Sequence, residues 1–263
     1  MKNILITIGL TCLVLISTAS NLDKRDLRIN TVIIDAGHGG KDPGTHGVSS
    51  REKDVALKIA QELGRIIKEY LKDVKVIYTR SNDTFIELEQ RANIANKVGA
   101  DVFISIHCNA VPRNTEKIYG TETYVMGLHT SKANFEVAKR ENSVILMEKN
   151  NKEVYEGFDP NSPDSYILFS LYQNAYLENS LNLAQKVEQQ FKNRVGRNSR
   201  GVKQAGFLVL YRTSMPSVLV EVGYLTNKKE EKYLNDPLGQ TYIASGIFRA
   251  FRDYKNELEA SLN

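Results

Sequence analysis

Hydrophobic residues along the chain follow two periods, one typical of buried strands and one typical of amphipathic helices. Short β-branched runs such as Val32-Ile33-Ile34 end at glycine-rich or polar segments, which predicts strands. Between residues 52 and 70 the apolar residues recur every three or four positions, which predicts a helix with one buried face. Strands are expected at residues 31–35, 74–79, 101–107, 120–126, 207–212 and 218–222, and helices at 52–70, 86–98, 132–149, 166–194 and 234–258.

The predicted strands and helices alternate along most of the chain. A strand–helix–strand unit connects parallel strands and leaves the helices on the faces of the sheet. The sequence therefore predicts an α/β fold, a single domain with a twisted, mostly parallel or mixed sheet flanked by helices. We find no internal repeat and no linker that separates two domains. Residues 127–165, which end in a polar loop at 150–165, are expected to form a helical insert.

The first twenty residues have the pattern of an export signal. Lys2 provides a short positive region, and an apolar run follows from Ile4 to Ile16. The run is too short to span a bilayer comfortably, because a membrane helix needs about 20 apolar residues. We expect a signal peptide at 1–20 that is cleaved near Ala19-Ser20, a leader at 21–30, and a mature chain without an integral membrane segment. A retained anchor is the alternative.

Composition and charge narrow the classes of function. The chain has 263 residues, of which 41% are hydrophobic and 25% charged, as in globular proteins. The net charge of +4 is small and the basic residues are scattered, so we expect no nucleic-acid partner. Cys12 lies in the expected signal peptide, which leaves Cys108 as the single cysteine of the mature chain. Stability must then come from a hydrophobic core and not from a disulfide within the chain.

Two histidines are expected at the same edge of the sheet. His38 follows the first strand within a glycine-rich segment (37–40), and glycines let the backbone approach a ligand closely. His107 ends the third predicted strand and shares one face of it with Phe103 and Ser105. Because ligand crevices lie at the carboxyl ends of parallel strands, the pair favours a functional site over an incidental turn.

Two glutamates interrupt apolar patterns. Glu52 is in phase with the buried face of the 52–70 helix, but Ser49 and Glu52 also fit a capping box, and the spacing leaves both interpretations open. Glu221 lies within the apolar 218–222 run, where a buried carboxylate is costly unless it is paired, protonated or near a cation. Exposure on an edge strand is the alternative for Glu221. A general base near a metal explains its position better.

These residue types match the requirements of a catalytic zinc site. Such a site has three protein ligands and keeps a fourth position for water. Zinc lowers the pKa of that water toward about 7, and a nearby glutamate accepts its proton. The sequence contains no HExxH motif, and one cysteine cannot build a thiolate site. Composition and spacing alone leave the metal open.

Four short segments carry the candidate residues and occur in a fixed order. They are residues 34–44 (IDAGHGGKDPG), 51–53 (REK), 105–110 (SIHCNA) and 220–227 (VEVGYLTN). Together they resemble zinc-dependent N-acetylmuramoyl-L-alanine amidases of the cell-separation type, also called cell-wall amidase type 3, which cleave peptidoglycan. The resemblance runs from about Thr31 to the C-terminus and implies a catalytic domain at residues 31–258.

The resemblance implies a role for each site residue. Zinc would be held by His38, Glu52 and His107, and Glu221 would be the catalytic carboxylate. The reaction would hydrolyse the amide bond between the lactyl group of N-acetylmuramic acid and the L-alanine of the stem peptide. The family's supporting residues would correspond here to Arg80, Arg91 and Asn109.

The insert has an implied role in control. Residues 138–143 (AKRENS) resemble the core of a helix that covers the zinc in cell-separation amidases, and Glu141 is the candidate blocking residue. A solvated, charged helix is the alternative. If the helix blocks the site, a division-site activator resembling a metal-free peptidase must pull it away.

Two other functions remain open from the sequence. One is a non-catalytic peptidoglycan-binding protein on the same scaffold, and the other is a zinc peptidase that cleaves between amino acids of the stem peptide. We find no appended wall-binding module. Export without a disulfide or lipid site suits a Gram-negative periplasm, and a monomer is the default.

Overall fold

The computed structural model describes residues 28–112, 115–128, 131–167 and 175–261. The expected signal peptide at residues 1–20 and most of the leader at 21–30 lie outside the described residues. In the described part of the chain, no helix is long and apolar enough to cross a membrane.

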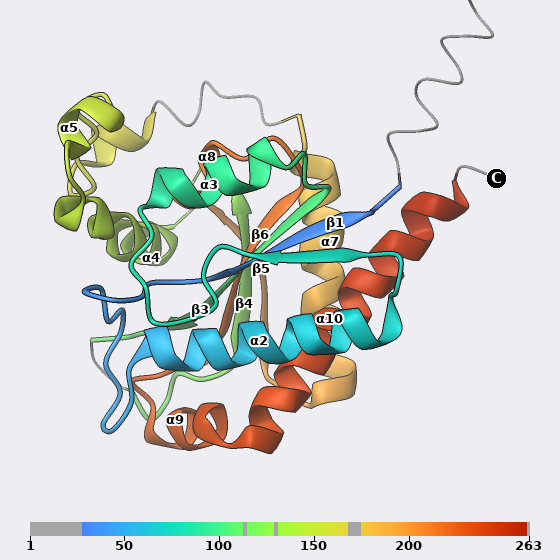
Figure 1. Cartoon of the computed structure of the whole chain (residues 1–263). Helices are drawn as coiled ribbons and strands as arrows, with labels where there is room; N and C mark the ends of the chain where they lie inside the picture. The colour runs from blue at the N-terminus through green and yellow to red at the C-terminus, as the bar shows by residue number, and fades with distance from the viewer. Residues whose placement is uncertain (1–27, 113–114, 129–130, 168–174, 262–263) are drawn as a thin grey trace, which may run out of the picture.

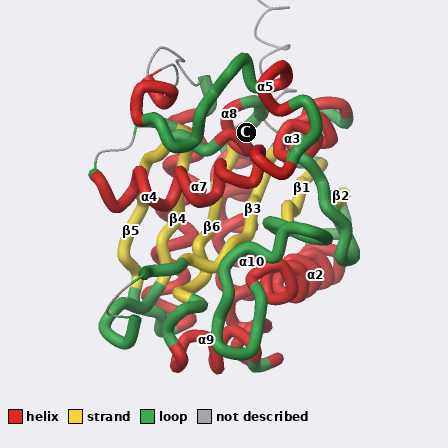
Figure 2. Tube along the Cα trace, turned by 90° about the vertical axis from the view of Figure 1, so that its left-hand side faces the viewer, coloured by secondary structure: helices red, strands yellow, loops and turns green. Residues whose placement is uncertain are grey.

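A six-stranded mixed sheet forms the centre of the described structure, with strand order β2-β1-β3-β6-β4-β5. Figure 2 shows the strands in this order, from β5 on its left to β2 on its right. All neighbouring strands are parallel except β4 and β6, which are antiparallel. The strands are β1 (Thr31–Ala36), β2 (Lys75–Tyr78), β3 (Val102–Asn109), β4 (Thr121–Met126), β5 (Ser199–Ala205) and β6 (Ser217–Tyr224). The predicted α/β class with a mostly parallel, mixed sheet is confirmed.

Helices cover both faces of this sheet (Figure 1). One layer contains α2 (Glu52–Tyr70), α7 (Leu177–Gln190) and α10 (Pro237–Ala260), and the other contains α3 (Leu88–Lys97), α4 (Lys132–Asn142) and α8 (Leu208–Tyr211). Two further helices, α5 (Asn151–Val154) and α9 (Lys228–Asn235), lie outside these layers. Short 3-10 turns cover Ser143–Met147 and Pro163–Tyr166, and a π turn covers Phe191–Val195.

Two hydrophobic cores lie on opposite faces of the sheet. Side chains alternate along each strand, so on β3 Ile104 and Ile106 enter the core beneath α2, whereas Phe103 enters the core beneath α4 and α8. Helix α2 contributes Val55, Ile59 and other fully buried residues at the spacing that predicted it. Each such side chain stabilises the fold by about 1.5–3 kcal/mol. On β3 and β6, the face opposite α2 therefore carries His107 and Glu221.

The sequence-based interpretation is wrong at one strand and misses another. Residues 207–212, predicted as a strand, form the single helical turn α8, because a short, wholly apolar run has no period that distinguishes the two states. The missed strand is β5, whose sequence SRGVKQA is mostly polar and half-buried. It lies at the edge of the sheet, where polar side chains reach solvent.

Three helix boundaries also differ from expectation. The helix predicted at 132–149 ends at Asn142 and continues as a 3-10 turn. The helix predicted at 234–258 is two helices, because the Asp236 side chain caps α10 and Pro237 is its first residue. The helix predicted at 166–194 is described from Leu177, and residues 168–174 lie outside the described part.

Candidate metal centre

Four side chains converge on one point at the carboxyl ends of β1 and β3. The converging atoms are His38 Nε2, Glu52 Oε1, His107 Nδ1 and Glu141 Oε2, which lie within 4.8 Å of one another. Each histidine nitrogen is 3.0–3.2 Å from both carboxylate oxygens. Nitrogen and oxygen ligands of a tetrahedral metal are roughly 3.3 Å apart, as follows from bonds of about 2.0–2.1 Å. In this four-atom cage, the four histidine–carboxylate separations are therefore close to the spacing of ligand atoms around zinc.

The donor set also fits a metal in its chemistry. All four side chains are at most 8% exposed. Among the described residues, two of the converging atoms, His38 Nε2 and Glu141 Oε2, are buried and make no hydrogen bond of normal geometry despite their short contacts. A buried group of two carboxylates and two imidazoles is costly unless a cation satisfies it, and imidazole and carboxylate are common zinc ligands. The residues present therefore fit a divalent cation such as zinc.

The backbone and a second carboxylate orient His38. The residue follows β1 with a φ of 60°, a left-handed conformation that non-glycine residues rarely adopt. Its Nδ1 lies 2.7 Å from Asp42 Oδ2, so the Asp42 carboxylate fixes the ring and directs Nε2 into the cage. Sequence reasoning missed Asp42, although a carboxylate four residues after a histidine was a signal that could have found it.

Glu52 is held in the cage by backbone donors. Its Oε1 accepts a hydrogen bond of 2.7 Å from Cys108 N, and its Oε2 accepts one of 2.7 Å from Thr45 N. The capping-box interpretation is wrong, because α2 begins at Glu52 and Ser49 is not its N-cap. The Ser49 hydroxyl donates instead to Glu231, a residue of α9. Glu52 therefore faces the site and does not cap its own helix.

Two buried arginines hold the segment that carries His38. Arg80 donates hydrogen bonds to the carbonyl oxygens of Ala36 and Gly37, at 2.9 and 2.6 Å. Arg91 donates to the carbonyl oxygen of His38 at 2.7 Å and to the buried Asp35 carboxylate at 2.8 Å. Burial and the neighbouring Arg91 lower the pKa of Arg80 to about 10, so the Arg80 guanidinium is still charged at neutral pH. These positions suit residues that support the site.

Glu221 lies beside the cage on the central strand β6. It is opposite His107 in the β3–β6 register and is 1% exposed, so exposure on an edge strand is ruled out. Its Oε2 is buried without a hydrogen-bond partner in the described structure. Burial and the nearby Glu141 carboxylate raise the pKa of Glu221 well above its usual value. A carboxyl with a raised pKa is suited to proton transfer near neutral pH.

Helix α4 covers the cage and contributes two adjacent charged residues. Glu141 is 5% exposed, so it is not part of a solvated helix face. Although burial opposes its ionisation, Arg140 and His107 hold the pKa of Glu141 well below its usual value. The Arg140 guanidinium lies 3.1 Å from Asn109 Oδ1 and 3.5 Å from Glu221 Oε1. These contacts of Arg140 were not predicted, because they join residues far apart in the sequence.

The fold and the donor set together are those of a metal-dependent hydrolase. Residues 32–253 match the family model described as N-acetylmuramoyl-L-alanine amidase. The chain belongs to this amidase family, whose members hydrolyse the bond between N-acetylmuramic acid and L-alanine in peptidoglycan.

Individual relatives agree with the family assignment. The chain is 35% identical to N-acetylmuramoyl-L-alanine amidase AmiA of Escherichia coli over 235 residues, which are 86% of this chain and 78% of AmiA. It is 32% identical to AmiC of Neisseria meningitidis, with 88% of this chain and 54% of AmiC covered. A solved amidase of Clostridium difficile 630 matches with a TM-score of 0.65 at 30% identity, covering 87% of this chain and 98% of that one. AmiC2 of Nostoc punctiforme gives 0.61 at 29% identity, with 85% and 96% covered.

Proposed function

We propose that this amidase is a zinc enzyme whose metal is held by His38, Glu52 and His107, and whose catalytic carboxylate is Glu221. The observation that carries the proposal is the buried cage, in which four donor atoms lie within 4.8 Å of one another and each histidine nitrogen is 3.0–3.2 Å from both carboxylate oxygens. When bound there, zinc supplies a Lewis acid that polarises the scissile carbonyl and lowers the pKa of water toward about 7. The catalytic domain spans residues 31–258 in this proposal, with the insert at 127–165.

Glu221 moves the proton in the proposed reaction. Its carboxylate takes a proton from the attacking water as the new carbon–oxygen bond forms at the lactyl carbonyl. The same proton then passes to the nitrogen of L-alanine while the carbon–nitrogen bond breaks. The products are a lactyl carboxylate and a peptide with a free amino terminus. Burial of Glu221 on β6, which is the first cause of its raised pKa and does not depend on Glu141, supports both transfers.

Helix α4 holds the site closed in this proposal. A catalytic zinc needs three protein ligands and one open position, and Glu141 supplies a fourth ligand atom to the cage. The guanidinium of the adjacent Arg140 pairs with the Glu221 carboxylate and so competes with water for this proton acceptor. One movement of α4 would release both groups. This supports autoinhibition by the insert at 127–165.

The cellular role follows from the closed site and the N-terminal pattern. An enzyme closed by its own helix needs a partner to open it, and we propose an activator protein at the division site. The signal-peptide pattern at residues 1–20 supports export to the periplasm, where the chain would act on peptidoglycan as a monomer. Daughter-cell separation is the process that such an activity would serve.

Peptidoglycan digests analysed by mass spectrometry test this proposal. We expect the zinc-loaded Glu141→Ala chain, and more so an Arg140→Ala/Glu141→Ala chain, to release peptides that start at L-alanine at least about tenfold faster than the unaltered chain. The Glu153→Ala chain is the matched control, since Glu153 is an exposed glutamate of the same insert. A chelator should abolish release. In the Arg140→Ala/Glu141→Ala background, Glu221→Gln should abolish turnover but keep zinc.

Three outcomes would contradict parts of the proposal. Equal release by the Glu141→Ala and Glu153→Ala chains would exclude Glu141 as the blocking residue. Cleavage between amino acids of the stem peptide would identify a zinc peptidase. No release from any folded, zinc-loaded chain would favour a peptidoglycan-binding protein without catalysis.

A further inference from the structure

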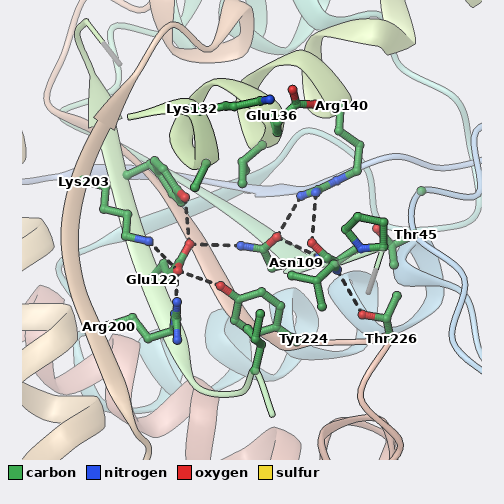
Figure 3. Close-up of a pocket in the computed structure, with 18 of the residues that line it drawn as sticks. Thr45, Asn109, Glu122, Lys132, Glu136, Arg140, Arg200, Lys203, Tyr224 and Thr226 are labelled. Carbon is green, nitrogen blue, oxygen red and sulfur yellow. Dashed lines mark hydrogen bonds and ion pairs between the residues drawn. The ribbon is translucent and has the colours of Figure 1, made fainter. Parts of the chain in front are cut away.

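A cavity of about 720 Å³ lies next to the metal centre, beneath α4. That volume falls within the range of small-molecule sites, about 300–1,000 Å³. In Figure 3, Lys132, Glu136 and Arg140 of α4 lie along one side, and Arg200 and Lys203 of β5 lie on another. The cavity reaches the catalytic residues through Arg140, which lines it and also contacts Glu221.

The sheet register aligns this cavity with the metal site. His107 of β3 is opposite Glu221 of β6, and Glu221 is opposite Glu122 of β4. Neighbouring strands are about 4.8 Å apart, so Glu122 is roughly 10 Å from the strand that carries His107. The next strand is β5, which carries Arg200 and Lys203. A line across the sheet from β3 through β6 and β4 to β5 therefore runs from His107, a proposed metal ligand, to the cations Arg200 and Lys203.

Glu122 holds those cations at the cavity wall. It is 1% exposed and accepts hydrogen bonds from Arg200 Nε at 2.8 Å, Tyr224 Oη at 2.6 Å and the Lys203 ammonium. One carboxylate between two cations leaves a surplus positive charge. The side chains of Arg200 and Lys203 are still 36% and 22% exposed, and together they have more N–H donors than Glu122 can accept. They can bind a further anion.

The positive charge of Arg200 and Lys203 indicates which part of the substrate, sugar or peptide, lies at the β5 wall of the cavity. On the proposed function, the sugar side of the scissile amide is neutral, because its lactyl carboxyl is part of that amide. The peptide side carries free carboxylates. An extended peptide covers about 3.3–3.6 Å per residue, so about three residues reach from the metal site to Glu122. A row of cations at that distance matches a carboxylate of the peptide and not a sugar.

We propose that the cavity binds the peptide part of the substrate, and that Arg200 and Lys203 bind a carboxylate about three residues from the scissile amide. This inference rests on the proposed function, and it adds a determinant of substrate choice. Peptidoglycan strands whose peptides are amidated and neutral bind more weakly, because they offer no anion to Arg200 and Lys203.

Calorimetric titration of the full chain with two peptides tests the inference. One peptide begins with L-alanine and has free carboxylates at its second and third residues, and the other has these groups amidated. We expect the unaltered chain to bind the acidic peptide about tenfold more tightly, as one charge-assisted contact provides. Lys203→Gln should reduce this preference to within about threefold. Glu122→Gln should increase it, since it frees both cations.

The Lys203→Gln and Glu122→Gln substitutions should change the preference for the acidic peptide in opposite directions, which separates recognition of the peptide from structural support. A general loss of structure would weaken binding in both variants, and thermal unfolding shows whether each is folded. Lys192 is an exposed lysine on the Phe191–Val195 π turn, so Lys192→Gln removes the same charge away from the cavity. This variant should keep the preference for the acidic peptide. Equal affinity for both peptides, no binding of either at millimolar concentration, or a preference unaffected by Lys203→Gln would overturn the inference. Peptidoglycan cleavage measured in parallel reports separately on the proposed function.

Discussion

The close approach of Gly37 to His107 allows a sharp test of the metal centre. A Cβ at position 37 would lie 2.5 Å from Nε2 and 2.7 Å from Nδ1 of His107. Ordinary contacts begin at roughly 3.5 Å, so the imidazole would have to move by about 1 Å. The backbone of Gly37 cannot move instead, because Arg80 binds its carbonyl oxygen and its N–H donates to Ile106.

The Gly37→Ala substitution should therefore weaken zinc binding without unfolding the chain. Loss of the group that orients a histidine ligand costs about 10–100-fold in metal affinity, and displacement of the ligand itself costs at least as much. We expect at least a tenfold weaker zinc affinity, which corresponds to about 1.4 kcal/mol. Competition with a chromophoric chelator measures the affinity, and circular dichroism confirms the fold.

A second glycine supplies the control for crowding in general. A Cβ on Gly64, in α2, would lie 2.5 Å from Tyr78 Cζ, away from the cage. Gly64→Ala should lower stability but leave zinc affinity unchanged. The reasoning would be refuted if Gly37→Ala bound zinc as tightly as the unaltered chain, or if both substitutions weakened zinc binding equally.

Two further predictions concern buried carboxylates. Burial opposes ionisation of Glu122, but Lys203 lowers the pKa of Glu122 to about 2 from the ordinary 4.5. The ionised carboxylate therefore adds about 3 kcal/mol to the free energy of unfolding above pH 5, and this contribution is lost as pH falls toward 2. The stability difference between the unaltered and Glu122→Gln chains in urea unfolding should therefore fall by about 1.4 kcal/mol from pH 7 to pH 3.5, and a constant difference would contradict this. Asp35→Asn should lower the free energy of unfolding by about 3 kcal/mol, because it leaves Arg91 buried and unpaired. Ser105→Ala removes one hydrogen bond to Asp35 and should cost about 1.5 kcal/mol, so equal losses would argue against the charge as the cause.

The elements nearest the site could be predicted from the sequence because pattern and burial agree there. The 52–70 helix and the strands β1 and β3 follow the predicted bounds to within two residues. The helix carries an apolar repeat of three or four positions, and the two strands are short, mostly β-branched runs that end at polar or glycine-rich segments. Because His38 and His107 lie at the carboxyl ends of parallel strands, the predicted fold alone places them at the same edge of the sheet.

The remaining features depend on contacts between distant segments. Arg140 and Glu221 are 81 residues apart, and only the resemblance of residues 138–143, not periodicity or spacing, indicated that α4 lies on the cage. The role of Glu52 is decided by the backbone N–H of Cys108, 56 residues away, and not by its own helix. Strand β5 was missed because its polar side chains face the cavity or solvent, so it lacks the apolar alternation of a core strand.

The strand order has a consequence for how the chain folds. β6 is the last strand along the chain, yet it lies in the middle of the sheet, between β3 and β4. Until residues 217–224 are in place, β2-β1-β3 and β4-β5 are two separate ribbons with no common neighbour. Pairings this distant in sequence form slowly, because a long loop must close first. Since the joining strand also carries Glu221 to His107, completion of the sheet and arrival of the carboxylate are a single folding event.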